Sequence, residues 1–312
     1  MQGNVGFNPA DDIPDLSGRV ILITGGTAGL GRATVVLLAA HHPAHIFFTG
    51  RAQGRADEVV NVAQLKAPTT SVTFLPMDLG SFASIHSAAQ QLMSRTSRLD
   101  LLFCNAGIMA VPADTTSDGY EIQFGTNHLG HALLIHQLLP TLLNTASKPN
   151  SDVRIISNTS TGFNNPPTGG IEFDRLKSSQ DLGLGGRWLR YGQSKLANIL
   201  YMSEMARRYP EILSVTIHPG VIKTDLVSSL SVVDQALVAA TALGKMITLE
   251  DGVKNQLYTA VRSRKDVING EFYEPVGAPG HHSALSKDTD LAARLWEWTE
   301  EEIKQYLYRI GK

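Results

Sequence analysis

The chain has 312 residues, of which 43% are hydrophobic and 18% charged, a balance typical of a folded globular protein rather than a disordered or fibrous one. Its 27 lysines and arginines against 29 aspartates and glutamates give a formal charge of −2, without the basic excess typical of a nucleic-acid-binding protein. The single cysteine, Cys104, excludes an internal disulfide and a cysteine-based zinc cluster, and it fits a reducing compartment.

Targeting and membrane signals are absent from the sequence pattern. Residues 1–16 lack the basic start and the apolar core of a signal peptide. No stretch reaches the roughly 18 uninterrupted apolar residues of a membrane-spanning helix, and the nearest one, residues 226–248, is interrupted by polar and charged side chains. We therefore expect a cytoplasmic protein without a membrane span.

From residue 20 onward, short apolar runs alternate with longer segments of helical period. The predicted strands are residues 20–24, 45–49, 72–76, 99–104, 153–157 and 213–218, and the predicted helices are residues 30–41, 56–66, 82–94, 118–143 and 192–209. This alternation, with strands that are apolar throughout, predicts a parallel sheet covered by helices on both faces. We expect an α/β protein with one Rossmann domain over residues 17–312, a doubly wound parallel sheet of about seven strands, after an N-terminal extension at 1–16.

Three later segments depart from the alternation. Residues 162–190 contain six glycines and no long apolar period, which predicts an extended loop. Residues 226–248 are rich in alanine, leucine and valine and are predicted to form a helix over the substrate site. Residues 281–312 are predicted to form a C-terminal tail of one or two helices that carries Trp296 and Trp298.

A glycine-rich run, TGGTAGLG at residues 24–31, follows the first predicted strand and leads into a helix. Glycines let the backbone turn tightly and approach a pyrophosphate, while the helix N-terminus offers free N–H groups and the positive end of its dipole. The spacing of Gly25, Gly29 and Gly31 is G-x-x-x-G-x-G. Its position between a strand and a helix predicts a dinucleotide-binding loop rather than an ordinary turn.

The end of the second strand favours NADP over NAD. An NAD site places an acidic residue about twenty residues beyond the glycines to hold the ribose 2′-hydroxyl. This chain instead has Thr49-Gly50-Arg51 and no acidic residue before Asp57. Arg51 is predicted to pair with the 2′-phosphate of NADP, and Arg32 to add a second contact. The alternative is that both arginines are solvated surface residues.

Tyr191 and Lys195 lie four residues apart at the start of a predicted helix, so they share one face. Because a nearby ammonium favours the phenolate, we expect Lys195 to bring the pKa of Tyr191 toward working pH and make it an acid–base group. A second pair with this spacing, Tyr308 and Lys312, follows no strand and is interpreted as incidental. Tyr191, in contrast, follows a strand that ends in Asn158-Thr159-Ser160.

Together these motifs resemble those of the short-chain dehydrogenase/reductase family over about residues 17–275. In the family's order, they are TGGTAGLG, Asp78-Leu79, CNAG at 104–107, Asn127, Ser160, YGQSK at 191–195, and Pro219-Gly220 with Thr224. The runs FGTNHLGHALL, YGQSKLAN and LWEWTEE are most similar to the retinol-dehydrogenase-like and WW-domain-oxidoreductase-like branch.

The resemblance implies a catalytic tetrad of Asn127, Ser160, Tyr191 and Lys195. Tyr191 would exchange a proton with the substrate oxygen, which Ser160 would also hydrogen-bond, while Lys195 would hold the nicotinamide ribose and Asn127 would order a water relay behind it. Ser160 is chosen over Ser157 because Ser157 lies inside the predicted strand. The implied cofactor contacts are Thr24, Gly25, Thr27, Gly29, Leu30, Gly31, Arg32, Arg51, Asp78 (at the adenine), Leu79, Asn105, Ala106, Gly107, Tyr191, Lys195, Pro219, Gly220, Val221 and Thr224 (at the carboxamide).

Some residues depart from the family pattern. Cys104 stands where the family has an asparagine, and its place at the end of a buried strand favours packing over reactivity. The 30 residues between Ser160 and Tyr191 are more than is usual, and we expect this insertion at the mouth of the active site. His128 and His131 share a helix, but no carboxylate or cysteine arrangement completes a metal site, so both are interpreted as packing or surface residues and no metal is expected.

The predicted function is that of an NADPH-dependent oxidoreductase. It would reduce a ketone or aldehyde of a hydrophobic small molecule, or oxidise the matching alcohol, by hydride transfer, with a place in secondary metabolism. Two alternatives stay open: a non-redox biosynthetic enzyme (a dehydratase or cyclase) on the same fold, and a non-catalytic NADP-binding regulator. The family resemblance implies a homodimer or tetramer packed through the helices of Asn127 and Tyr191, unless the C-terminal tail covers that surface and leaves a monomer.

Overall fold

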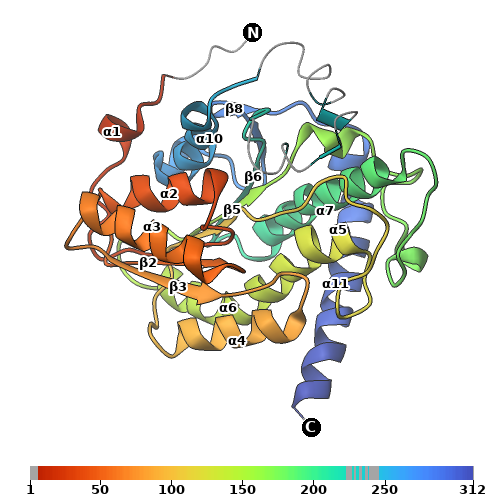
Figure 1. Cartoon of the computed structure of the whole chain (residues 1–312), viewed down its shortest axis with the longest axis horizontal. Helices are drawn as coiled ribbons and strands as arrows, with labels where there is room; N and C mark the ends of the chain where they lie inside the picture. The colour runs from red at the N-terminus through yellow and green to blue at the C-terminus, as the bar shows by residue number, and fades with distance from the viewer. Residues whose placement is uncertain are drawn as a thin grey trace.

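The computed structural model describes residues 6–222 and 246–311, together with positions 227, 230, 231, 234, 235 and 238 between them. Most of residues 226–248, predicted to be a helix over the substrate site, therefore lies outside the described residues. Figure 1 shows a central sheet with helices on both sides and a long C-terminal helix whose end projects from the body.

One eight-stranded sheet with the order β3-β2-β1-β4-β5-β6-β7-β8 forms the centre of the described chain. The strands are β1 (Val20–Ile23), β2 (His45–Gly50), β3 (Ser71–Pro76), β4 (Leu101–Cys104), β5 (Arg154–Asn158), β6 (Leu213–Ile217), β7 (Phe272–Glu274) and β8 (Ala278–Pro279). All neighbours pair in parallel except β7 and β8, which are antiparallel. The predicted doubly wound parallel sheet is confirmed, with eight strands instead of about seven.

Helices enclose the sheet in two layers. The layer that packs on one face contains α2 (Gly29–Ala39), α3 (Gln53–Lys66) and α10 (Leu249–Val261). The layer on the other face contains α4 (Phe82–Met93), α6 (Gly130–Ala146), α7 (Gly186–Arg208) and α11 (Thr289–Ile310). The short helices are α1 (Pro9–Asp12), α5 (Ile122–Phe124), a π-helical turn (Gly125–Leu129) and four 3₁₀ turns (Thr161–Asn164, Phe173–Arg175, Arg264–Asp266 and Leu285–Lys287).

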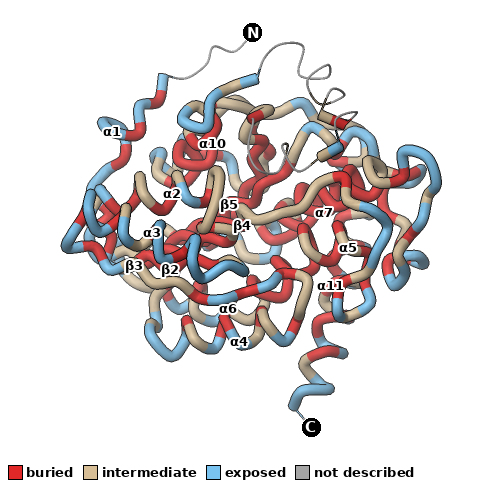
Figure 2. The backbone as a smooth tube through the Cα atoms, in the orientation of Figure 1, coloured by how far each residue is buried: buried red, intermediate tan, exposed pale blue. Residues whose placement is uncertain are grey.

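The core is divided by the sheet into two apolar clusters. Every residue of β1, β4, β5 and β6 is buried, which explains their continuous apolar pattern, since a parallel sheet is covered on both faces. Figure 2 shows the buried strands and inner helix sides, and the exposed tip of α11. Phe7, Ile13 and Leu16 of the N-terminal extension are buried in the cluster beneath α2 and α10. No helix of the described residues is long and apolar enough to cross a membrane.

Several boundaries differ from the prediction. The helix expected over 118–143 begins at Ile122 and passes through the π turn, and α7 begins at Gly186 rather than at 192. Tyr191 therefore lies in the second turn of α7 and not at its start. The sequence 186–190 has no apolar repeat of its own and follows a glycine-rich stretch, so its pattern resembled a loop. The C-terminal tail is a single helix, α11, instead of two.

Candidate active site

The predicted site residues gather at one edge of the sheet, beyond the carboxyl ends of the parallel strands. The connection from β1 to α2 and the first turn of α2 hold Thr24, Gly25, Thr27, Gly29, Leu30, Gly31 and Arg32; Arg51 follows β2, Asp78 and Leu79 follow β3, Asn105, Ala106 and Gly107 follow β4, Ser160 follows β5, and Pro219, Gly220 and Val221 follow β6. The strand order reverses between β1 and β4, and open α/β sheets bind ligands at such a point. Thr224 lies outside the described residues.

The backbone of the glycine loop lies so close to its neighbours that a side chain at Gly25 or Gly31 would clash with them. Gly25 has a positive φ of 67°, and a Cβ placed there would lie 2.9 Å from the Cβ of Ala106. A Cβ on Gly31 would overlap the carbonyl oxygen of Gly25 and lie 2.6 Å from Nδ2 of Asn105. The N-terminus of α2 is thereby held against the end of β1. This cradle of bare backbone fits the pyrophosphate of a dinucleotide.

Arg51 and Arg32 lie at the exposed rim of this loop. The end of β2 reaches the loop, because the N–H of Gly26 donates to the carbonyl oxygen of Thr49 over 2.9 Å and a Cβ on Gly50 would lie 2.7 Å from the Thr27 side chain. Within the described chain, neither guanidinium is paired with a carboxylate. Both cations are thus available to an anionic group next to the loop.

Tyr191 and Ser160 meet where β5 ends. Ser160 lies two residues beyond β5 and caps the 3₁₀ turn that follows, whereas Ser157 is inside the strand, as predicted. The Ser160 side chain lies beside the ring of Tyr191, which is 5% exposed, because a Cβ on Gly162 would lie within 3.5 Å of both. A Cβ on Gly162 would lie 3.0 Å from the Tyr191 ring, so this turn packs directly against the phenol.

The side chain of Lys195, one helical turn after Tyr191, is held in position by a backbone carbonyl group. Its Nζ donates to the carbonyl oxygen of Asn158 over 3.1 Å and lies 5.7 Å from the centre of the Tyr191 ring. Nδ2 of Asn198 donates to the same oxygen over 3.1 Å. Asn158 and Asn198 were not singled out from the sequence, although Asn158 directly precedes the Thr159-Ser160 pair at the end of the strand.

Asn127 completes the group from the π turn. Its Nδ2 donates to the carbonyl oxygen of Ile108 and to Oγ of Ser194, both over 2.9 Å, and its Oδ1 accepts from the N–H of Ile108 over 2.8 Å. A Cβ on Gly107 would lie 3.0 Å from this Oδ1 and 3.4 Å from Nζ of Lys195. The four residues of the predicted tetrad are therefore brought together. Single-turn π helices frequently occur at functional sites.

Burial sets the protonation of the tetrad. It raises the pKa of Tyr191 to about 12, against the lowering effect of the neighbouring Ser160 hydroxyl, and it lowers the pKa of Lys195 to about 8. In the chain alone, the pKa of Tyr191 therefore moves away from neutral pH, opposite to the expectation that Lys195 lowers this pKa. The reason is the burial of the phenol, which disfavours the charged phenolate.

The insertion between Ser160 and Tyr191 is fastened to α7 on both sides of Tyr191. Arg190, which is 2% exposed, forms a buried ion pair with Glu121 (Nε to Oε1, 3.1 Å) and donates to the carbonyl oxygens of Val111 (2.9 Å) and Gln180 (3.2 Å). Gln193 donates to Oε1 of Gln180 over 2.9 Å. The insertion, predicted as an extended loop, contains two 3₁₀ turns and this buried anchor, which its sequence pattern does not indicate.

Trp188 lies beside Tyr191 in the first turn of α7. Their ring centres are 6.2 Å apart in an edge-to-face arrangement, and the indole N–H of Trp188 donates to Oδ1 of Asp234 over 3.0 Å. The same oxygen pairs with Arg187 over 2.9 Å. Asp234 belongs to the segment after β6, so this part of the chain is tied to the helix that carries Tyr191.

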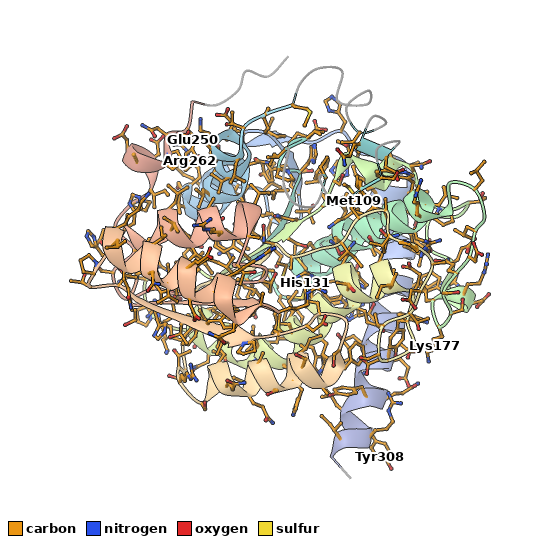
Figure 3. The ribbon with its side chains drawn as sticks, in the orientation of Figure 1. Met109, His131, Lys177, Glu250, Arg262 and Tyr308 are labelled. Atoms are coloured by element: carbon orange, nitrogen blue, oxygen red, sulfur yellow. The ribbon has the colours of Figure 1, made fainter. Side chains whose placement is uncertain are left out.

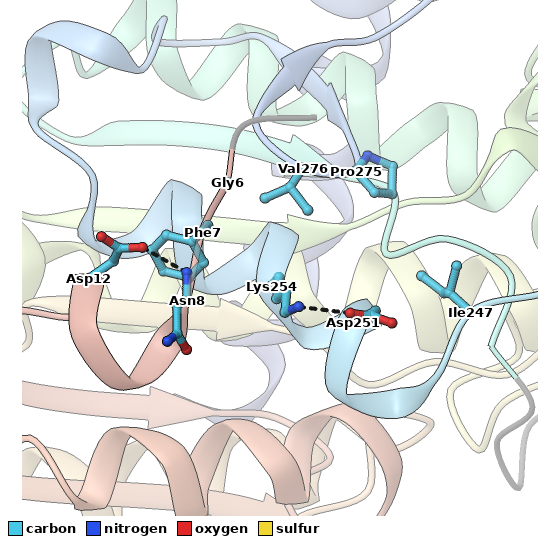
Figure 4. A pocket seen from close by; sticks show the side chains of 9 residues that line it. All are labelled: Gly6, Phe7, Asn8, Asp12, Ile247, Asp251, Lys254, Pro275 and Val276. Carbon is cyan, nitrogen blue, oxygen red and sulfur yellow. Dashed lines mark hydrogen bonds and ion pairs between the residues drawn. The ribbon is translucent and has the colours of Figure 1, made fainter. Parts of the chain in front are cut away.

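A cavity of about 640 Å³ lies away from these residues, between the N-terminal residues and α10 (Figure 4). Its wall includes Phe7, Lys254 and Pro275, and Lys254 pairs with Asp251 over 2.7 Å. None of the tetrad lines it. We therefore place the candidate active site at the strand ends and not in this cavity.

The buried histidines His128 and His131 contact different elements, and only the tyrosine of the second tyrosine–lysine pair is among the described residues. No group of three potential metal ligands occurs within the described ranges. Nε2 of His128 contacts Thr299 of α11 over 3.0 Å, while Nε2 of His131 contacts Thr24 over 2.9 Å. Tyr308 lies at the exposed end of α11, far from His131 in Figure 3, and Lys312 is outside the described residues.

Comparisons with known proteins agree with this geometry. The family model described as short chain dehydrogenase matches residues 19–170. The chain is 33% identical to the short-chain dehydrogenase/reductase drtF of Aspergillus calidoustus over 94% of this chain and 96% of that one, and 35% identical to a short-chain dehydrogenase/reductase of Armillaria gallica over 95% and 94%.

Two solved structures extend the likeness to three dimensions. A putative uncharacterized protein from Mycobacterium paratuberculosis superposes with a TM-score of 0.73 at 28% identity, covering 96% of this chain and 98% of the other. A carbonyl reductase from chicken fatty liver, solved with NADPH bound, superposes with a TM-score of 0.63 at 27% identity, covering 86% and 100%.

Proposed function

The chain belongs to the short-chain dehydrogenase/reductase family of oxidoreductases, and from this premise we propose that it is an NADPH-dependent carbonyl reductase. Its substrate is the ketone or aldehyde of a hydrophobic small molecule, and Tyr191 is the proton donor. The observation that carries the proposal is the meeting of Tyr191, Ser160 and Lys195 at the end of β5, beside the glycine loop.

The proton chemistry of Tyr191 favours the direction of reduction. A phenol whose pKa is about 12 stays protonated at working pH, and it is a far stronger acid than an alcohol. Transfer of its proton to an oxygen that gains alkoxide character is therefore favourable. The Ser160 hydroxyl, next to the Tyr191 ring, would hydrogen-bond the substrate oxygen and hold it beside that proton.

The remaining residues of the tetrad orient the reacting groups. Lys195, held by the carbonyl of Asn158, is positioned to hydrogen-bond the nicotinamide ribose, and Asn127 supports the loop that faces Lys195. When bound, NADPH supplies the hydride that reduces the carbonyl carbon. The contribution of the protein is to hold donor and acceptor in a reactive orientation and to deliver the proton.

Two observations support NADP over NAD. Arg51 and Arg32 are exposed cations beside the glycine loop, and no acidic residue follows β2 before Asp57. The solved carbonyl reductase at 27% identity is described as NADPH-bound. We propose that the two guanidinium groups bind the 2′-phosphate, with Arg51 as the main contact.

A hydrophobic substrate is supported by the aromatic wall beside the phenol. Trp188 presents its ring to Tyr191, and Asp234 fixes the indole through its N–H. Val227 and Leu230, from the segment after β6, are half-buried apolar residues of the same segment as Asp234. A flat or branched apolar group next to the reacting carbonyl would pack against this indole.

The test is oxidation of NADPH and of NADH by the full chain in the presence of a panel of bulky ketones and aldehydes. We expect turnover with NADPH, and we expect Tyr191→Phe to lower kcat/KM by about a hundredfold to ten-thousandfold while NADPH still binds. Arg51→Ala is expected to weaken NADPH binding by about tenfold to a hundredfold and to leave NADH binding unchanged.

Arg95→Ala is the matched control, because Arg95 is an exposed arginine near His45, at the opposite end of β2. It is expected to change neither cofactor's binding. NADPH binding without turnover of any carbonyl would instead favour a regulator. Conversion of a substrate without consumption of NADPH would favour a dehydratase or cyclase.

A further inference from the structure

His131 connects the two halves of the candidate site. It lies on α6, is 4% exposed, and is at the centre of the molecule (Figure 3). Its Nε2 lies 2.9 Å from Oγ1 of Thr24, at the start of the glycine loop, and its Nδ1 lies 3.0 Å from the carbonyl oxygen of Asn127, at the π turn. Each ring nitrogen thus reaches one half of the site.

The partners determine where the ring proton lies. A carbonyl oxygen only accepts hydrogen bonds, so Nδ1 must carry the hydrogen toward Asn127. Burial lowers the pKa of His131 to about 4, with Lys195 as a further cation that disfavours protonation, so the ring is neutral. Nε2 of a neutral ring with a protonated Nδ1 is an acceptor, and the group that faces it is the Thr24 hydroxyl, which can donate to it.

The hydrogen bonds then run in one direction across the site. Oγ1 of Thr24 accepts from the N–H groups of Asn105 (2.9 Å) and Ala106 (3.0 Å). Its own hydrogen has two acceptors within reach, Nε2 of His131 at 2.9 Å and the carbonyl oxygen of Phe103 at 3.2 Å, and the nearer is Nε2 of His131. Nδ1 of His131 in turn donates to Asn127. This series of hydrogen bonds joins the ends of β1 and β4, where a dinucleotide would bind, to Asn127, which supports the loop that faces Lys195. With Nδ1 protonated and the Thr24 hydroxyl turned toward Nε2, both ring nitrogens of this buried histidine have a hydrogen-bond partner.

We propose that His131 is a positioning residue, which as the neutral Nδ1–H tautomer sets the glycine loop and the Asn127–Lys195 side of the tetrad in register. This inference rests on the proposed function, since register matters only if a cofactor on one half reacts with a substrate on the other. A loss of register would slow hydride transfer more than it weakens substrate binding, because orientation and not contact is lost.

The chain offers a matched control in His128. It is also buried and lies one helical turn earlier, but its Nε2 contacts Thr299 of α11 and its ring packs against Phe124 and Tyr201. Its replacement removes a buried histidine of the same region without touching Thr24. If both histidines only stabilised the fold, replacing either one would lower kcat to a similar extent. The proposed role instead predicts a larger loss of kcat for the replacement of His131.

The first experiment determines the tautomer in the full chain without cofactor, by ¹⁵N–¹H NMR of histidine-labelled protein, with His131→Phe used to assign the signal. We expect His131 to carry its hydrogen on Nδ1 and to stay neutral from pH 5 to pH 9. A hydrogen on Nε2, or a titration near the ordinary histidine value, overturns the proposal. This result does not depend on any substrate, so it is distinct from a failure of the proposed function.

The second experiment dissects the two contacts by kinetics. His131→Phe is expected to lower kcat by about tenfold to a hundredfold with the KM of the carbonyl substrate little changed, while His128→Phe leaves kcat nearly unchanged. In His131→Asn the shorter amide can replace Nδ1 only, and in His131→Gln the longer amide can replace Nε2 only, so both are expected to be slow. Equal kcat losses in the two phenylalanine variants, or wild-type kcat in both amide variants, would overturn the proposal even if His131→Phe fails to fold.

Discussion

Lys195 and Tyr191 share one face of α7, and burial moves their pKa values in opposite directions. The lysine loses its charge more easily, and the phenol loses its proton less easily, than in water. The spacing of the two residues indicated their proximity, but not the depth of the site. Burial depends on Ser160, on the insertion and on β6, which are distant in the sequence. The pKa expectation from the sequence therefore had the wrong direction for the chain alone.

The pH dependence of carbonyl reduction tests the role of the single residue Lys195. Because burial lowers its pKa to about 8, the ammonium is present below that pH and is lost above it. We expect kcat for reduction to be constant at lower pH and to fall as pH rises through about 8. Lys195→Met is expected to be slow and to lack this descending limb. Persistence of the limb in Lys195→Met would assign it to another group.

The elements of the fold were predicted unevenly. The bounds of strands β1 to β6 were predicted to within two residues at each end, because continuous apolar runs between helices leave few alternatives. The short strands β7 and β8 and the helix α10 were not predicted, since their pattern is too brief or too mixed. The anchoring of the insertion by Arg190 could not be predicted from the sequence either, because Glu121 and Val111 lie far from Arg190 along the chain and only the fold brings them together.

The buried pair of Arg190 and Glu121 should stabilise the contact of α5, α7 and the insertion. Arg190→Met leaves the buried Glu121 carboxylate without its cation, and we expect a loss of about 3–5 kcal/mol in the free energy of unfolding, measured by urea denaturation. The double variant Arg190→Met with Glu121→Gln is expected to recover much of this loss, because no buried charge is left unpaired. A single variant as stable as the wild type would show that the pair contributes little.

On the scale of the whole molecule, α11 covers the outer side of α7. Trp296 of α11 stacks on Tyr201 of α7 with ring centres 4.7 Å apart, and the guanidinium of Arg208 lies 4.9 Å from the Trp296 ring. Glu302 of α11 accepts a hydrogen bond from Tyr120 over 2.7 Å and pairs with Lys177 of the insertion over 2.7 Å. The C-terminal helix thus occupies the surface through which family resemblance implied assembly.

We therefore expect a monomer in solution. The four most exposed large apolar side chains of the described residues, Leu184 in the insertion, Leu65 on α3, Tyr308 on α11 and Ile268 before β7, lie on four separate elements. Size-exclusion chromatography with light scattering should give the mass of one chain, unchanged over a hundredfold dilution. A dimer mass that persists on dilution would contradict this expectation.

The central claim is that the chain moves a hydride from NADPH to a carbonyl carbon. The most direct measurement uses NADPH deuterated at both C4 positions with a carbonyl substrate from the panel, followed by mass spectrometry of the alcohol. The account predicts one deuterium on the carbinol carbon for each NADPH consumed, and almost no product with Tyr191→Phe. A product without deuterium, or one formed at the same rate by Tyr191→Phe, would contradict it.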